Sequence, residues 1–275
     1  MAPLASQRAL FDIPGDVAWF NIAYNGPLLK RAAAALEEGA RSKLHPWTRK
    51  PEHFFDGPAR FRLLAARAFG GDAENYAVIP SASYGIGTVA RIMEARLGAG
   101  DEVVVLEETF PSNFLPWARL CAETGARIVT ARRRPDFDWT ASVLERIGPA
   151  TRLVAVPQVH WTDGSALDLV AVGEAARAVG AVLVLELTQS LGVMPVDLAA
   201  VRPDFMVAAG YKWLLFPYGL SLFYVDAAWH GARPLEETWQ GREGAERFEA
   251  LVPYGEAYAP GARRFDMGEK STPSL

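Results

Sequence analysis

The sequence predicts an α/β protein whose strands form a mostly parallel sheet. Residues 182–185 are a continuous apolar run, the pattern of a parallel strand that is covered on both faces. Residues 204–209 form a second short strand pattern. Stretches with helical spacing separate such runs along the chain, which is the order of elements in an α/β fold.

The composition is that of a globular protein with a large core. Half of the 275 residues are apolar and the net charge is −4, so one or two domains are expected. The mild acidity argues against a nucleic-acid surface, and the basic run 132–134 is expected to be a solvated loop. Asp12, Pro14 and Asp16 interrupt the N-terminal region, so neither a signal peptide nor a membrane span is expected.

Cys121 is the only cysteine, which excludes a disulfide framework and a thiolate metal site and favours a reducing cytoplasm. Its neighbours predict a packed helix face, so a buried inert thiol is favoured over a nucleophile. No metal site is expected, because the histidines show no HExxH or similar spacing.

In the first third of the chain, helices are expected at residues 28–43 and 57–69. A strand at residues 76–80 then leads through the small-residue turn 81–85 into another helix. This order predicts an anion site, because free backbone N–H groups and the helix dipole both favour a phosphate there. It is not a dinucleotide fingerprint, since the third glycine is missing, and Ser81 or Ser83 taken alone would be a helix cap.

Further strands are expected at residues 102–106, 127–131, 153–157 and 219–225, and further helices at residues 139–147 and 168–179. The loop after residue 157 contains His160. Imidazole titrates near neutral pH, so His160 is a candidate for proton transfer, and a structural histidine is the alternative.

Four polar side chains follow the two strands of the stretch 182–216, namely Glu186, Gln189, Tyr211 and Lys212. They are expected to share one site, because the ligand crevice of an open α/β sheet lies at the carboxyl ends of its strands. A desolvated lysine is nucleophilic because its pKa is lowered. A carboxylate at the end of a buried strand is costly unless it is paired. The alternatives are a lysine paired with an acid, and a glutamate bonded to an arginine or to backbone N–H groups.

The segment LELTQSLGVMPVDLAAVRPDFMVAAGYKWLL resembles the core signature of the class V aminotransferases, which are fold-type I pyridoxal-phosphate (PLP) enzymes. The resemblance implies the large domain of that fold, with a seven-stranded, mostly parallel sheet between helices. It implies that Lys212 holds the cofactor as a Schiff base. Glu186 would face the pyridine nitrogen, where the family normally has Asp. Gln189 would bind the phenolic oxygen and Tyr211 the phosphate.

The resemblance implies further contacts along the chain. Ala82 and Ser83 match the turn that binds the PLP phosphate, and Phe110 matches a ring that stacks on the cofactor. Asn25 and His160 lie in segments that pass beside the substrate or the cofactor in relatives. An Asn before Gly is also a common turn, and Phe110 packed in the core is the alternative there.

The C-terminal part contains the run RRFDMGEKSTP, which is similar to a family stretch that reaches the cofactor phosphate of the other subunit. Ser271 and Thr272 are the candidates for that contact, and Arg264 is a candidate for substrate binding. Relatives continue into a small domain that supplies an arginine for the substrate carboxylate and, in desulfurases, the catalytic cysteine. The sequence is therefore expected to be partial, with the C-terminal small domain largely absent.

Three segments are expected: residues 1–30 near the substrate site, residues 31–240 as the PLP-binding domain, and residues 241–275 as the start of the C-terminal region. The resemblance implies a cytoplasmic homodimer that acts on the amino group or α-carbon of an amino acid, with transamination leading. Desulfuration, kynureninase-like cleavage and epimerisation stay open, although Phe110 in place of the usual His disfavours desulfuration. A catalytically silent partner protein is the alternative from another class, and a nucleotide-binding domain is disfavoured.

Overall fold

The sheet of the computed structural model, which describes residues 5–252 and 254–271, has seven strands in the order β1-β7-β6-β5-β4-β2-β3. The strands are β1 Tyr76–Ile79, β2 Glu102–Leu106, β3 Arg127–Ala131, β4 Thr151–Pro157, β5 Val182–Glu186, β6 Phe205–Ala209 and β7 Ser221–Val225. The neighbours β3, β2, β4, β5 and β6 pair in parallel, and β7 runs antiparallel to both β6 and β1. The predicted seven-stranded, mostly parallel sheet is confirmed.

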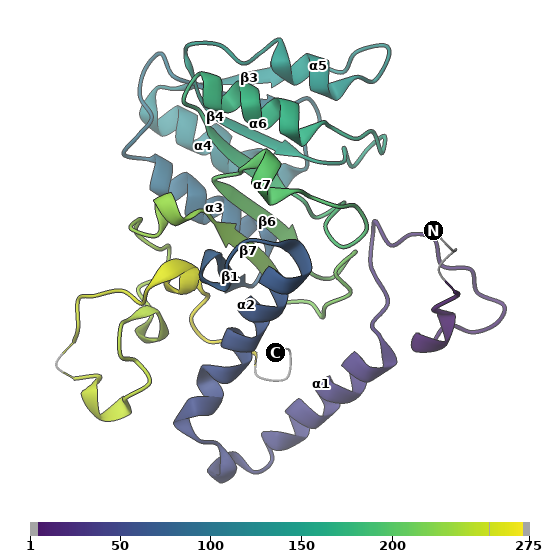
Figure 1. The fold of residues 1–275 in the computed structure, drawn as a ribbon, viewed down its shortest axis with the longest axis vertical. Coiled ribbons are helices and arrows are strands. Elements are labelled where there is room, and N and C mark those ends of the chain that lie inside the picture. The colour runs from purple at the N-terminus through teal and green to yellow at the C-terminus, as the bar shows by residue number, and fades with distance from the viewer. Residues whose placement is uncertain (1–4, 253, 272–275) are drawn as a thin grey trace.

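Helices cover both faces of the sheet (Figure 1). They are α1 Lys30–Ser42, α2 Asp56–Phe69, α3 Ala82–Met93, α4 Leu115–Thr124, α5 Trp139–Leu144, α6 Leu169–Ala178 and the short α7 Leu198–Val201. The predicted helices are confirmed to within a few residues at their ends, and α7 was not predicted. Asp138, Asp168 and Asp197 cap α5, α6 and α7 by accepting hydrogen bonds from backbone N–H groups of the first turn.

The strands divide their side chains between two cores. Val103 and Val105 of β2 face α3 and α4, where Cys121 is a buried free thiol. Val104 and Leu106 face α2, α5 and α6 on the other side. Because successive strand residues point to opposite faces, a continuous apolar run signals a strand that is covered on both.

The chain after β7 continues as short 3-10 turns and comes to lie beside the edge strand β1; the turns are Ala227–Trp229, Trp239–Gly241, Phe248–Ala250 and Gly261–Phe265. It is tied to β1 by Asp266, whose Oδ1 accepts a hydrogen bond from the Val78 backbone N–H at 2.7 Å. Its Oδ2 pairs with Arg62 at 2.9 Å and with Lys270 at 3.5 Å. The division into three segments that the sequence suggested stays a prediction.

The basic run 132–134 is neutralised by acids rather than gathered into a patch. Arg132 pairs with Glu107, Arg133 with Glu108 and Asp163, and Arg134 with Asp136 and Glu145. No helix in the described part of the chain is long and apolar enough to cross a membrane.

Candidate functional site

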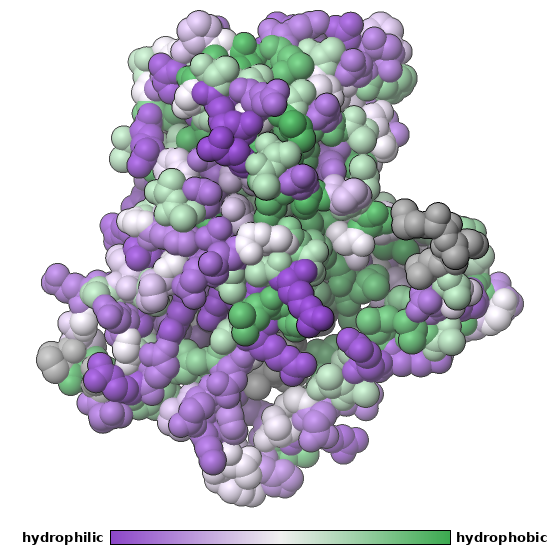
Figure 2. All heavy atoms as spheres, viewed as in Figure 1, coloured by the Kyte–Doolittle hydropathy of each residue, from purple (hydrophilic) through white to green (hydrophobic). Residues whose placement is uncertain are grey.

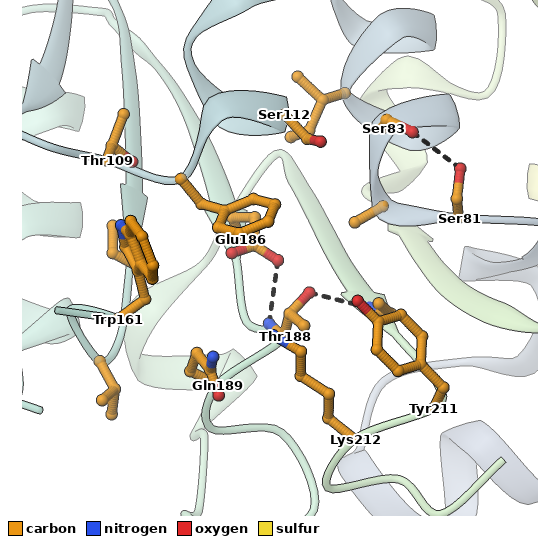
Figure 3. A pocket seen from close by; sticks show the side chains of 16 residues that line it. Ser81, Ser83, Thr109, Ser112, Trp161, Glu186, Thr188, Gln189, Tyr211 and Lys212 are labelled. Carbon is orange, nitrogen blue, oxygen red and sulfur yellow. Dashed lines mark hydrogen bonds between the residues drawn. The ribbon is translucent and has the colours of Figure 1, made fainter. Parts of the chain in front are cut away.

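A cavity lies at the carboxyl ends of β4, β5 and β6 and at the start of α3 (Figure 3). It is lined by Ser81, Ala82, Ser83, Ile86, Thr109, Phe110, Ser112, Pro157, Val159, Trp161, Glu186, Thr188, Gln189, Ala209, Tyr211 and Lys212. The four strand-end side chains singled out in the sequence therefore meet here, together with the predicted phosphate turn and Phe110. The cause is topological, since parallel strands end at one edge of the sheet.

Lys212 presents a buried amine to this cavity. It follows the end of β6, and only 7% of the residue is exposed. In Figure 3 its side chain extends toward Glu186 and Thr188. Burial lowers the pKa of Lys212, and the Glu186 charge opposes that shift. Its Nζ lies 5.6 Å from the centre of the Phe110 ring and makes no ion pair within 4 Å in the described residues.

Glu186 is the acid of the cavity, at the last position of β5. Its Oε1 accepts a hydrogen bond from the Thr188 backbone N–H at 3.1 Å. Thr188 is held in turn, because its hydroxyl oxygen accepts a hydrogen bond from the Ala209 backbone N–H at 3.0 Å. Burial raises the pKa of Glu186, and the contacts to Thr188 and the Lys212 charge counteract this only in part. The carboxyl group has no arginine partner among the described residues.

The turn before α3 offers polar groups at a helix N-terminus. Ser81 caps α3, since its hydroxyl oxygen accepts a hydrogen bond from the Tyr84 backbone N–H at 3.2 Å. The Ser81 and Ser83 hydroxyl groups are hydrogen-bonded to each other at 2.9 Å. Ser81 can therefore cap α3 and also belong to an anion site, because a capped helix start can still hold an anion.

Phe110 and Trp161 form an aromatic wall of the cavity. The two rings meet edge to face, 5.5 Å apart. The Trp161 indole N–H donates to the Glu108 backbone carbonyl at 2.7 Å, which fixes a side chain that is still 48% exposed. A flat apolar surface of this kind suits a planar ligand.

His160 is the residue of the loop after β4 that was predicted to act in the site, and Trp161 was not predicted. His160 does not line the cavity: it is fully buried and stacks on Trp139, with ring centres 4.5 Å apart. Its ring nitrogens are within 3.0 Å of the Glu107 backbone carbonyl and 2.9 Å of the Thr162 hydroxyl. Val159 and Trp161 face the cavity and His160 does not, which is the alternation of an extended chain. The sequence signal that could have identified Trp161 is its position two residues after Val159 and four after Pro157, which places all three on the same side of an extended chain.

Arg133 ties the loops after β2 and β4 together. Its Nη2 donates to the Glu108 carboxylate at 2.8 Å and to the Thr162 hydroxyl at 2.7 Å, and its Nε lies 3.3 Å from the Asp163 carboxylate. These loops carry Phe110 and Trp161. Arg133 therefore acts as a clamp, because its contacts hold together the two loops that form the aromatic wall.

Gln189, Tyr211 and Asn25 lie around the lysine. The Gln189 side chain donates to the Ala23 backbone carbonyl and accepts from the Trp213 indole N–H, both at 3.1 Å. The Tyr211 ring stacks on Tyr218 with centres 4.2 Å apart, and burial raises the pKa of Tyr211. Asn25 does not line the cavity, and its backbone carbonyl accepts a hydrogen bond from the Trp19 indole. Its segment nevertheless adjoins Gln189 and the lysine turn.

The C-terminal candidates do not line the cavity of the single chain. The Arg264 guanidinium lies 5.2 Å from the centre of the Tyr258 ring, and burial lowers the pKa of Arg264. Ser271 is exposed, and Thr272 lies outside the described residues. A contact of these residues with a second subunit stays a prediction.

Comparison with known proteins gives consistent matches. The family model Aminotransferase class-V matches residues 58–247. A kynureninase of Deinococcus radiodurans is 32% identical over 99% of this chain and 66% of its own length. A cysteine desulfurase of Klebsiella pneumoniae is 31% identical over 66% of this chain and 48% of its own length. The chain thus spans about half to two thirds of the length of these relatives.

Solved structures share the fold at lower identity. A C-DES mutant with glycine covalently linked to its PLP cofactor has a TM-score of 0.86 at 20% identity, over 98% of this chain and 71% of that chain. The apo cysteine desulfurase of Thermococcus onnurineus NA1 has a TM-score of 0.82 at 20% identity, over 97% and 66%. The sheet and its covering helices therefore have the fold of these enzymes.

Proposed function

The chain belongs to the class V aminotransferase family, and on this premise we propose that it is a PLP-dependent enzyme that acts at the amino group or α-carbon of an amino acid. The observation that carries the proposal is Lys212. Its amine is buried at a strand end, burial lowers its pKa, and it shares a cavity with a buried acid. A lysine in this setting is a nucleophile toward carbonyl compounds.

The donor set of the cavity fits PLP. The amine of Lys212 would hold the aldehyde carbon, and Glu186, a buried acid without a cationic partner within 4 Å in the described residues, would face the ring nitrogen. The start of α3 at Ala82 and Ser83 would hold the phosphate. Phe110 provides a flat face and Gln189 a side-chain amide. When bound, PLP supplies an electron sink for reactions at the α-carbon.

Residues of the chain itself would transfer protons, position the acid and line the cavity. Lys212, whose pKa is lowered by burial, is the group that can take a proton from the substrate α-carbon and return one. The Thr188 backbone N–H holds Glu186 in place. The wall of Phe110 and Trp161 gives one side of the cavity an apolar aromatic surface.

Within the family we favour cleavage of a substrate with an aromatic side chain, as in kynureninase. Two observations support this choice. The kynureninase match extends over 99% of the chain, and the cavity has an exposed tryptophan beside Phe110. Incubation with L-kynurenine is expected to release anthranilate, which is followed by its fluorescence.

Transamination is the second candidate. It needs one group that moves a proton between two carbons, and Lys212 alone can perform that task. In that case L-kynurenine gives no anthranilate, whereas an amino acid without an added acceptor converts the bound cofactor once and bleaches its visible absorbance. Desulfuration would release sulfur from cysteine, and epimerisation would change only the configuration of the substrate.

The cofactor test uses the protein with added PLP. Wild type is expected to gain a visible absorption band, and borohydride reduction followed by mass spectrometry should find the cofactor on Lys212. Lys212→Ala should lose both signals, whereas the exposed Lys43→Ala should keep them. An unchanged band in Lys212→Ala would remove this lysine from its role. A protein that binds PLP but converts no amino acid would be the silent partner protein.

We also propose that the protein works as a homodimer in the cytoplasm. Helix α1 stands away from the sheet in Figure 1, and none of its residues is buried. An apolar groove lies between α1, α2 and residues 213–222, and Figure 2 shows apolar side chains gathered around the hollow beside the N-terminal part. A second subunit would cover this surface. The buried free thiol of Cys121 is compatible with a reducing compartment.

A further inference from the structure

Residues 23–26, here called the strap, lie against the turn that carries Lys212. The Gly26 backbone N–H donates to the Tyr211 backbone carbonyl at 2.8 Å. At the other end of the strap, the Ala23 carbonyl accepts a hydrogen bond from Gln189 at 3.1 Å. The Gln189 side chain also accepts from the Trp213 indole. The strap is thus bonded to the residue before the lysine and, through Gln189, to the residue after it.

Gly26 allows an unusually close approach. A Cβ atom at this position would lie 2.1 Å from the Lys212 carbonyl oxygen and 3.0 Å from its carbonyl carbon. These distances are well below van der Waals contact, and the obstructing atoms belong to the backbone. The φ angle of Gly26 is not positive, so space rather than backbone conformation requires a glycine here.

The lysine turn has little freedom to move away. The Lys212 carbonyl already accepts a hydrogen bond from the Leu215 backbone N–H at 3.1 Å, and Leu215 has a positive φ of 57°. The Phe216 backbone N–H donates to the Gly210 carbonyl at 2.9 Å and closes the same turn. A shift of the Lys212 carbonyl would therefore disturb the whole segment 210–216.

We propose that the strap is a positioning element of the lysine site, in which Gly26 fixes the backbone of residues 211 and 212 so that the Lys212 side chain enters the cavity. The cofactor part of this inference rests on the proposed function. The docking of the strap on the lysine turn does not. A positioning role of this kind matters because a displacement of about 1 Å is enough to lower the efficiency of a site by ~100-fold.

The first experiment compares Gly26→Ala with Gly15→Ala in the holoenzyme. Gly15 lies in the same N-terminal region, and a Cβ there would meet no atom within 4 Å. We expect the apparent dissociation constant for PLP, read from the visible band, to rise at least about tenfold in Gly26→Ala, which is about 1.4 kcal/mol. We also expect the pH at which that band titrates to shift. In Gly15→Ala both quantities should match wild type within about twofold. A folded Gly26→Ala protein with wild-type values would overturn the proposal.

The second experiment needs neither cofactor nor mutant. Hydrogen exchange at residue resolution in wild type should show the Gly26 amide protected by its bond to Tyr211, at least about tenfold more than the Gly15 amide. An unprotected Gly26 amide would overturn the proposal even if the mutant cannot be purified.

The two proposals can fail separately. If wild type fails to bind PLP while the Gly26 amide is protected, the proposed function fails and the docking of residues 23–26 on the lysine turn stands. Acetylation of Lys212 in cofactor-free Gly26→Ala then decides the positioning role, because its rate should differ from wild type.

Discussion

Lys212 and Glu186 are both more than nine-tenths buried, and burial moves their pKa values in opposite directions. The lysine is pushed toward the neutral amine and the glutamate toward the neutral acid. Each group's charge opposes the shift of the other, but desolvation is the larger effect for both. Burial in the cofactor-free cavity therefore disfavours the charged form of both groups.

The pKa of Lys212 can be tested directly in the cofactor-free protein. Acetylation of its amine should become half-maximal at a lower pH than acetylation of the lysine in a short model peptide, because only the neutral amine reacts and burial lowers the pKa of Lys212. Competitive labelling with mass spectrometry measures the protein and the added peptide in one sample, so the peptide is an internal control. Equal midpoints would contradict the predicted effect of burial.

The raised pKa of Glu186 makes stability depend on pH. The protonated acid stabilises the fold fully below its unfolded pKa of about 4.3, and this contribution is lost as the pH rises through the folded pKa. Glu186→Gln keeps the group neutral at every pH. The cofactor-free variant is expected to be more stable than wild type at neutral pH and equal to it below about pH 4, as measured by denaturant unfolding. A difference that does not depend on pH would refute this.

At the scale of elements, the site depends on how loops from different strands are joined. The loops after β2 and β4 carry Phe110 and Trp161, and Arg133 at the end of β3 binds both loops. Glu108 in the first loop has a positive φ of 53°, so its backbone conformation is one that the surrounding contacts must maintain.

Arg133→Ala should therefore loosen the aromatic wall. We expect a clear loss in the free energy of unfolding, because the contacts to Glu108, Thr162 and Asp163 are removed together. Arg132→Ala is the matched control: Arg132 is 76% exposed and its contact to Glu107 is 3.8 Å long, so a change within about 0.5 kcal/mol is expected. Urea unfolding curves give both values. Equal effects for the two variants would show that Arg133 does not act as a clamp.

Asp266 joins the C-terminal segment to β1 and α2. Its substitution by Ala leaves Arg62 and the buried Lys270 without their counter-charge and the Val78 backbone N–H without its acceptor. Removing one partner of a buried pair costs about 3–5 kcal/mol, and we expect a loss of that size in denaturant unfolding. Glu123→Gln removes the exposed pair with Arg119 and should change stability by less than about 1 kcal/mol. A loss of less than about 1 kcal/mol for Asp266→Ala would contradict the anchoring role.

At the scale of the whole molecule, α1 and the groove beside it form an apolar surface that the described part of the single chain leaves uncovered. An isolated helix of 13 residues is marginal in water, so α1 needs a packing partner. The groove is lined by Ala32, Ala35, Leu36, Phe61, Leu64, Phe69 and Trp213, among others. We interpret α1 and this groove as one subunit's half of a dimer interface.

Light scattering on a sizing column should therefore give twice the mass of the chain. Leu64→Glu places a charge in the groove and is expected to shift the protein toward monomer. Leu63→Glu changes the neighbouring exposed residue of α2, which does not line the groove, and should leave the dimer intact. A monomeric wild type, or equal behaviour of the two variants, would remove this interface from the proposal.

The sequence by itself determined the sheet, most helices and several residues that line the cavity. Continuous apolar runs identify strands that are buried on both faces, and parallel strands end at one edge, so Glu186, Gln189, Tyr211 and Lys212 had to converge. The resemblance added Ala82, Ser83 and Phe110, which line the same cavity.

Only the tertiary structure decided the contacts between segments far apart in the chain. Side chains alternate between the two sides of the loop after β4, and the fold decides that Trp161 rather than His160 faces the cavity. The role proposed for Gly26 depends on its close approach to the Lys212 backbone. Asp266 gains its partners from α2 and β1. Local patterns record which side chains must be buried, whereas distances between distant segments arise only when the packed sheet brings the segments together.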